Sequence, residues 1–124
     1  VARENPNITF YYFITPYSIY YFDSLHQAGT LEKSLLLHEA AIRQMLDVPN
    51  IKVFSFLDLY SDIENLDNYK DPFHYGEWMN TAFLHYMKNQ EHLVTNDNFA
   101  AYCRQINSHY MDFDYDALFT AAGA

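Results

Sequence analysis

Asp71 and His74, an aspartate and a histidine three residues apart, are the residues of this sequence whose types and spacing best suit catalysis. Histidine titrates near neutral pH, and a neighbouring carboxylate can accept its Nδ1 proton and stabilise the imidazolium that forms during acyl transfer. Pro72 stiffens the turn between them, so the two side chains can meet. The second ring nitrogen would then act as general base toward a serine hydroxyl. The spacing is also compatible with an aspartate that caps a turn and a histidine on the surface.

Two further histidine patterns could indicate a metal site, and each lacks a necessary feature. His38 and Glu39 resemble the start of a zinc-protease helix, but that motif needs a second histidine where this sequence has Ile42. His85 and His92 could share a metal only if one helix continued unbroken through both. The sequence therefore predicts no metal site and no cofactor.

Aromatic residues are abundant, with 12 tyrosines and 10 phenylalanines, and they concentrate in residues 10–13 and 17–22. Such side chains can fill the faces of a buried strand and the segment after it, or they can form the wall of a substrate cleft. Both interpretations stay open at the level of sequence. The candidate substrate-binding residues are Tyr17, Ser18, Tyr20 and Tyr21.

The elements that must position these residues can be read from the hydrophobic pattern. Residues 8–15 and 51–56 are continuous apolar runs, which are typical of strands covered on both faces. Between them, residues 31–46 repeat apolar side chains at intervals of three and four, which predicts a helix. The unit is therefore βαβ, with parallel strands and a right-handed crossover. We expect residues 17–29 to form a loop, with room for a helical turn.

Asp71 and His74 follow the second strand, in a connection that precedes a helix predicted over residues 77–88. Ligands of open α/β sheets bind beyond the carboxyl ends of the strands, so the position suits a site. Residues 57–68 are expected to be a short helical or irregular connection, and residues 96–110 and 114–122 to be further helices. The predicted fold is α/β: a partial three-layer αβα sandwich with parallel strands, flavodoxin-like, and a helical C-terminus, forming part of one domain over residues 1–124.

Residues 68–80, which contain Asp71-Pro72-Phe73-His74-Tyr75-Gly76, resemble the last block of the SGNH/GDSL hydrolase superfamily. In that family a D-x-x-H motif after the final strand is followed at once by the C-terminal helix. The order of strand, loop, helix and strand upstream is also similar, so the resemblance covers about two-thirds of the chain. It implies that Asp71 orients His74 and that His74 is the base for a serine nucleophile. A looser similarity to D-alanyl-lipoteichoic-acid biosynthesis proteins favours an extracytoplasmic location.

The sequence departs from the family in lacking the Gly-Asp-Ser nucleophile block and the glycine and asparagine blocks of the oxyanion hole. The resemblance thus implies the C-terminal part of a serine esterase or O-acyltransferase whose N-terminal half carries the nucleophile, acting on an acyl ester, for instance of a cell-envelope polymer. The alternative is a catalytically silent SGNH-like module that binds a glycan through its aromatic segment or assembles with a partner protein. A purely structural domain, in which Asp71 and His74 do not meet, is a third possibility.

Composition and charge limit the kinds of partner that the chain can bind. The formal net charge is −9, which repels phosphate backbones and anionic lipids, so we expect no nucleic-acid partner. No run of eighteen apolar residues is present, so we expect no membrane insertion by this segment. Cys103 is the sole cysteine, which excludes an internal disulfide. Part of a sheet also exposes an edge, which predicts a homodimer through that edge.

Overall fold

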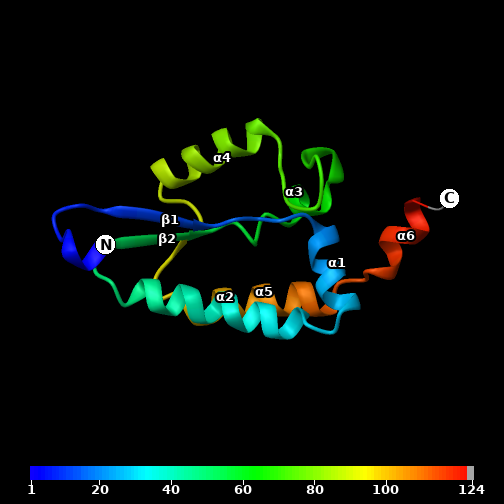
Figure 1. Cartoon of the computed structure of the whole chain (residues 1–124), viewed down its shortest axis with the longest axis horizontal. Helices are drawn as coiled ribbons and strands as arrows, with labels where there is room; N and C mark the ends of the chain where they lie inside the picture. The colour runs from blue at the N-terminus through cyan, green and yellow to red at the C-terminus, as the bar shows by residue number, and fades with distance from the viewer. Residues whose placement is uncertain (123–124) are drawn as a thin grey trace.

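A small three-stranded sheet lies at the centre of the computed structural model, which describes residues 1–122 (Figure 1). Strands β1 (Phe10–Ile14) and β2 (Ile51–Ser55) pair in parallel, with Phe10 opposite Ile51 and Ile14 opposite Ser55. The predicted parallel pair is therefore confirmed. The sheet as a whole is mixed, because β3 (Leu93–Val94) pairs antiparallel with the other side of β2. That strand was not predicted, since two residues are too few to show a periodicity.

Helices account for most of the remaining chain. The predicted helices over residues 31–46 and 77–88 are confirmed as α2 and α4, and the helix expected over residues 96–110 begins at Phe99 and ends at Asp112. In chain order, the helices of the described residues are η1 (Ala2–Glu4), α1 (Ile19–Gln27), α2 (Leu31–Leu46), α3 (Tyr60–Glu64), η2 (Leu66–Asn68), α4 (Glu77–Lys88), α5 (Phe99–Asp112) and α6 (Asp116–Ala122).

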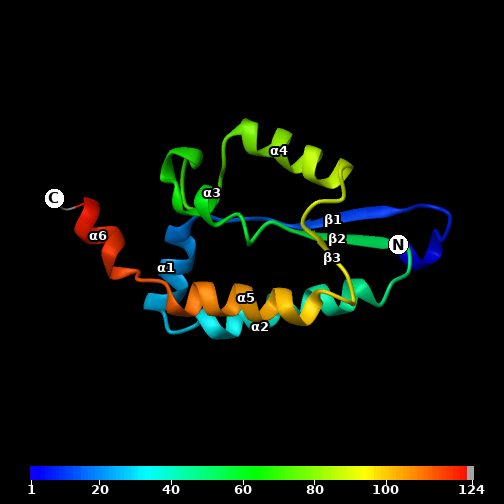
Figure 2. The same cartoon turned by 180° about the vertical axis from the view of Figure 1, so that it is seen from behind.

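The two faces of the sheet are covered by different helices. Helix α4 lies on one face, and α2 and α5 lie side by side on the other (Figures 1 and 2). On the α4 side, Phe54 and Phe56 pack against Met79 and Phe83. On the opposite side the cluster consists of Ile42, Val53, Val94, Phe99 and Cys103. Coverage of both faces explains the continuous apolar run of β2, whose last three residues are buried. The same expectation is wrong for β1, where Tyr11 and Tyr12 are exposed because this strand lies at an edge of the sheet.

The expectation of a loop over residues 17–29 is wrong, because Ile19–Gln27 forms helix α1. Ile19 and Phe22 are buried at the helical spacing of three. Tyr20 meets Phe119 of α6, and Tyr21 meets Phe73. Aromatic side chains therefore contact neighbours on several sides of this helix, and the period of one buried face does not show in the sequence.

Within residues 1–122, no helix combines the length and the apolar character needed to cross a membrane.

Candidate active site

A short loop between η2 and α4, residues 69–76, carries Asp71 and His74. Tyr69 and Tyr75 form an antiparallel bridge at its base. The backbone N–H of Lys70 donates to the carbonyl of His74 at 2.7 Å, and that of Gly76 donates to the carbonyl of Asn68 at 2.8 Å. The loop is thus closed by its own backbone, and helix α4 begins directly after it.

The structure brings Asp71 and His74 together. The Nδ1 atom of His74 lies 2.7 Å from Oδ2 of Asp71. The other carboxylate oxygen, Oδ1, accepts the backbone N–H groups of Phe73 at 2.8 Å and of His74 at 2.9 Å. This is the geometry of an Asx turn, in which the aspartate folds the loop and holds the imidazole at the same time.

The hydrogen bonds keep Asp71 ionised. The N–H of Phe73 is the largest cause that lowers the pKa of this carboxyl, followed by the hydrogen bond with the His74 side chain. An ionised carboxylate at Nδ1 fixes the tautomer in which Nδ1 carries the proton and Nε2 is free to accept one. Among the described residues, Nε2 of His74 has no hydrogen-bond partner, and the side chain is 74% exposed.

An open cleft of about 560 Å³ adjoins His74. Thr15 follows the last residue of β1, so the cleft lies at the carboxyl end of that strand, where α/β sheets bind ligands. Aromatic rings supply much of its wall, and His74 is the only histidine among the residues that line it. The lining residues are Thr15, Tyr17, Phe73, His74, Tyr75 and Asn80.

The candidate substrate-binding tyrosines occupy different places. Tyr17 lines the cleft, with its ring edge-to-face against Phe73 at 5.4 Å between centroids. Tyr21 packs behind it, 4.7 Å from Tyr17, and burial raises the pKa of its hydroxyl. Tyr20 lines a separate hollow of about 280 Å³, together with Asp71. The structure therefore brings Tyr17, and not Tyr20, to the cleft of His74.

Ser18, the remaining candidate, is fully buried. Its Oγ and its backbone N–H both donate to the carbonyl oxygen of Pro72, each at 3.0 Å. Ser18 lies beside the smaller hollow and not among the residues that line the cleft of His74. The hydroxyl is thus engaged with the loop that carries the Asp71–His74 pair.

The structure forms two more pairs of a carboxylate and a histidine. Nδ1 of His92 lies 2.9 Å and 3.0 Å from the two carboxylate oxygens of Asp58, and Nε2 of His109 lies 2.9 Å from Glu64. Sequence reasoning missed both pairs because 34 and 45 residues separate their members. The only signal available was the position of Asp58, just after β2 at the carboxyl edge of the sheet.

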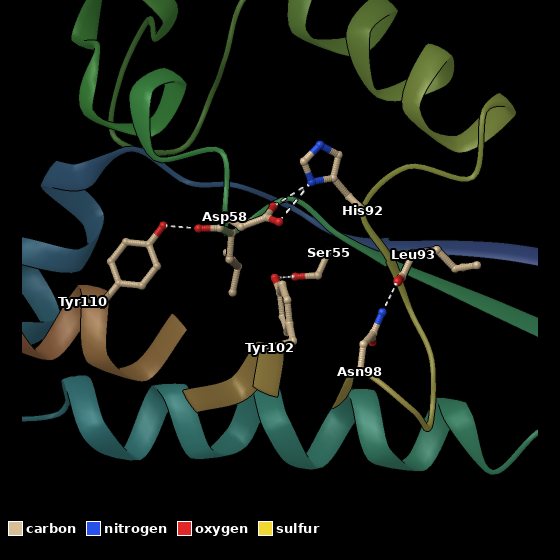
Figure 3. Close-up of polar contacts among 8 residues, drawn as sticks. Ser55, Asp58, His92, Leu93, Asn98, Tyr102 and Tyr110 are labelled. Atoms are coloured by element: carbon tan, nitrogen blue, oxygen red, sulfur yellow. Dashed lines mark hydrogen bonds and ion pairs between the residues drawn. The ribbon is translucent and has the colours of Figure 1, made fainter. Parts of the chain in front are cut away.

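Figure 3 shows Asp58 and His92 facing each other beyond the end of β2. Both side chains are 23% exposed, and neither lines the cleft of His74. Ser55 points away from them toward α5, where the hydroxyl of Tyr102 donates to its Oγ (Figure 3). Because Ser55 is fully buried and hydrogen-bonded, it does not complete a nucleophile–histidine arrangement with His92.

Among the described residues, the side chains of histidine, cysteine, aspartate and glutamate form no group of three or more that could hold a metal ion.

The comparisons with known proteins add no relative. No family model matches the sequence, and neither a curated protein nor a solved structure matches the chain.

Proposed function

We propose that this chain supplies the acid–base pair of a serine esterase or O-acyltransferase of SGNH type, with His74 as general base and Asp71 as the residue that orients it. The observation that carries the proposal is the 2.7 Å contact between Nδ1 of His74 and Asp71 at the edge of a cleft beside β1. The parallel β1–β2 pair with helices on both faces agrees with part of an αβα sandwich of that superfamily.

In the proposed reaction, Nε2 of His74 removes the proton of a serine hydroxyl as the oxygen attacks the ester carbonyl. The negative charge of Asp71 stabilises the imidazolium that results. The same proton then passes to the leaving alkoxide as the tetrahedral intermediate collapses, so that the ester bond breaks and the acyl group stays on the serine. Water or an acceptor alcohol, deprotonated in turn by Nε2, then takes the acyl group, and the serine regains its proton. These proton transfers all use Nε2, because Asp71 occupies Nδ1.

The nucleophile of this proposal belongs to a Gly-Asp-Ser block in the N-terminal half expected from the family resemblance. Within the chain, Ser18 and Ser55 lie near the carboxyl ends of the strands, but both are buried with hydroxyls engaged in hydrogen bonds. A hydroxyl fixed in this way is not available to attack a carbonyl in the cleft of His74.

The test is His74→Ala in the full-length protein, assayed with p-nitrophenyl acetate as a short-chain acyl ester. Loss of the general base should lower kcat about 10²- to 10⁴-fold. His85→Ala, on α4 and outside the cleft, is the matched control and should leave turnover unchanged. Unchanged turnover in His74→Ala would remove the proposal.

A catalytically silent binding module is the second candidate, and the aromatic wall of the cleft favours it. The ring of Phe73 is 47% exposed beside Tyr17, and exposed aromatic faces can stack on a sugar. If this candidate is correct, Tyr17→Ala should abolish binding of neutral oligosaccharides measured by calorimetry, while Tyr20→Ala, in the other hollow, should not.

A further inference from the structure

Two segments far apart in the chain, the one after β1 and the loop that carries Asp71 and His74, are joined by hydrogen bonds. The segment after β1 provides Ser18, whose Oγ and backbone N–H both donate to the carbonyl oxygen of Pro72 at 3.0 Å. In the opposite direction, the hydroxyl of Tyr69 donates to the carbonyl oxygen of Pro16 at 2.7 Å. Three hydrogen bonds therefore fix the loop of residues 69–76 to the segment that follows β1.

The pair itself has little packing to hold it in place. The side chain of His74 is 74% exposed and that of Asp71 is 39% exposed, so few neighbours restrict where they lie. Pro72 follows Asp71 directly, and its carbonyl group belongs to the peptide that precedes Phe73. Fixing this peptide therefore fixes the N–H of Phe73, which donates to Oδ1 of Asp71.

Burial makes the hydrogen bond of Ser18 persistent. The residue has no exposed surface, so water does not compete for its hydroxyl. Two donors from one residue on a single carbonyl also restrict the direction of that carbonyl as well as its distance. Catalytic groups must be held close to their productive geometry, and a shift of about 1 Å is enough to cost about 100-fold in rate.

We propose that Ser18 is a positioning residue for the Asp71–His74 pair, acting through the Pro72 carbonyl, and that it neither binds substrate nor serves as nucleophile. This inference rests on the proposed function for its effect on turnover. Its effect on the imidazole does not depend on that function.

The experiment compares Ser18→Ala with Ser18→Thr in the full-length protein, using turnover of p-nitrophenyl acetate. Ser18→Ala removes one of the two donors to Pro72, and we expect kcat to fall about tenfold with KM nearly unchanged. Ser18→Thr keeps the hydroxyl and should restore most of kcat. The matched control is Ser24→Ala, which removes a serine hydroxyl that donates to the carbonyl of Tyr21 within α1 and should change neither constant.

A spectroscopic measurement separates positioning from a general loss of structure. With ¹⁵N-labelled histidine, the Nδ1–H tautomer of His74 should be less populated in Ser18→Ala, while the signals of His92 keep their wild-type positions. Tyr69→Phe removes only the bond to Pro16 and should shift His74 in the same direction by a smaller amount. It provides the same test if Ser18→Ala does not fold.

The outcomes distinguish this inference from the function on which it rests. Wild-type kcat and a wild-type His74 spectrum in Ser18→Ala would overturn the role of Ser18, whatever His74→Ala does. Conversely, if His74→Ala retains full turnover, the proposed function fails, and the spectrum of His74 in Ser18→Ala still decides whether Ser18 positions the imidazole.

Discussion

At the scale of single residues, His74 and His92 show the same local chemistry in different surroundings. In each, Nδ1 contacts an aspartate carboxylate within 3.0 Å. His92 is 23% exposed and packs against Phe56 and Tyr86, whereas His74 is 74% exposed beside a cleft. The histidine that we propose as general base is thus the more accessible of the two.

The titration of Asp71 tests the source of its ionised state. The pKa of the Asp71 carboxyl in the folded protein lies below its ordinary value of 3.8. The ionised carboxylate therefore stabilises the folded state at pH values above 3.8, and this contribution is lost as the pH falls through the lower pKa of the folded protein. A ¹³C titration of the carboxyl carbon should therefore have its midpoint below 3.8.

The variant His74→Ala gives the control for this titration. Because the N–H of Phe73 is the largest cause of the lowered pKa, we expect part of the lowering to persist without the imidazole. A midpoint that returns fully to 3.8 in His74→Ala would contradict the geometry of the Asx turn.

At the scale of elements, the hydrophobic pattern predicted the helices that bury one face and missed a helix with contacts on several sides. Helix α2 buries Leu31, Leu35 and Ile42 on one face, so its period is visible in the sequence and its bounds were predicted correctly. Helix α1 was missed because its aromatic residues contact several neighbours. These neighbours, α6 and the loop of Phe73, are distant in sequence, so a short window of sequence does not show that α1 contacts them.

The candidate site shows the same limit. The contact between Asp71 and His74 could be predicted because only Pro72 and Phe73 lie between them. The pairing of Asp58 with His92 could not, since it depends on β3 returning antiparallel beside β2. The hydrogen bond of the buried Ser18 could not be predicted either, because its acceptor, Pro72, is 54 positions away in sequence.

Packing between β2 and α4 gives a prediction at this scale. Phe56 has no exposed surface, and its ring stacks on Phe83 with centroids 4.5 Å apart. Phe56→Ala should lower the free energy of unfolding by about 3–5 kcal/mol, because it removes buried apolar surface and leaves a cavity. Urea unfolding followed by circular dichroism measures the difference. Phe73→Ala, at an exposed position, should cost less than about 1 kcal/mol.

At the scale of the whole molecule, β1 is one of the two edge strands of the sheet that the described residues form, and β3 is the other. Tyr11 and Tyr12 are 44% and 40% exposed on this strand, and β2 pairs with only one of its sides. An uncovered edge offers unpaired backbone groups to another strand. A second copy of the chain is the partner that we predict for this edge.

Self-association through β1 can be tested on the chain of 124 residues. Its sedimentation coefficient should rise with concentration, because dimerisation through β1 would pair the free edges of two copies. Tyr12→Lys should suppress the rise, since a charged side chain on an edge strand opposes pairing. Leu37→Lys adds the same charge on the exposed surface of α2 and should leave the rise unchanged. A sedimentation coefficient independent of concentration in the unmodified chain would show that β1 does not pair with a second copy. Suppression by both variants alike would show that the association does not depend on this edge.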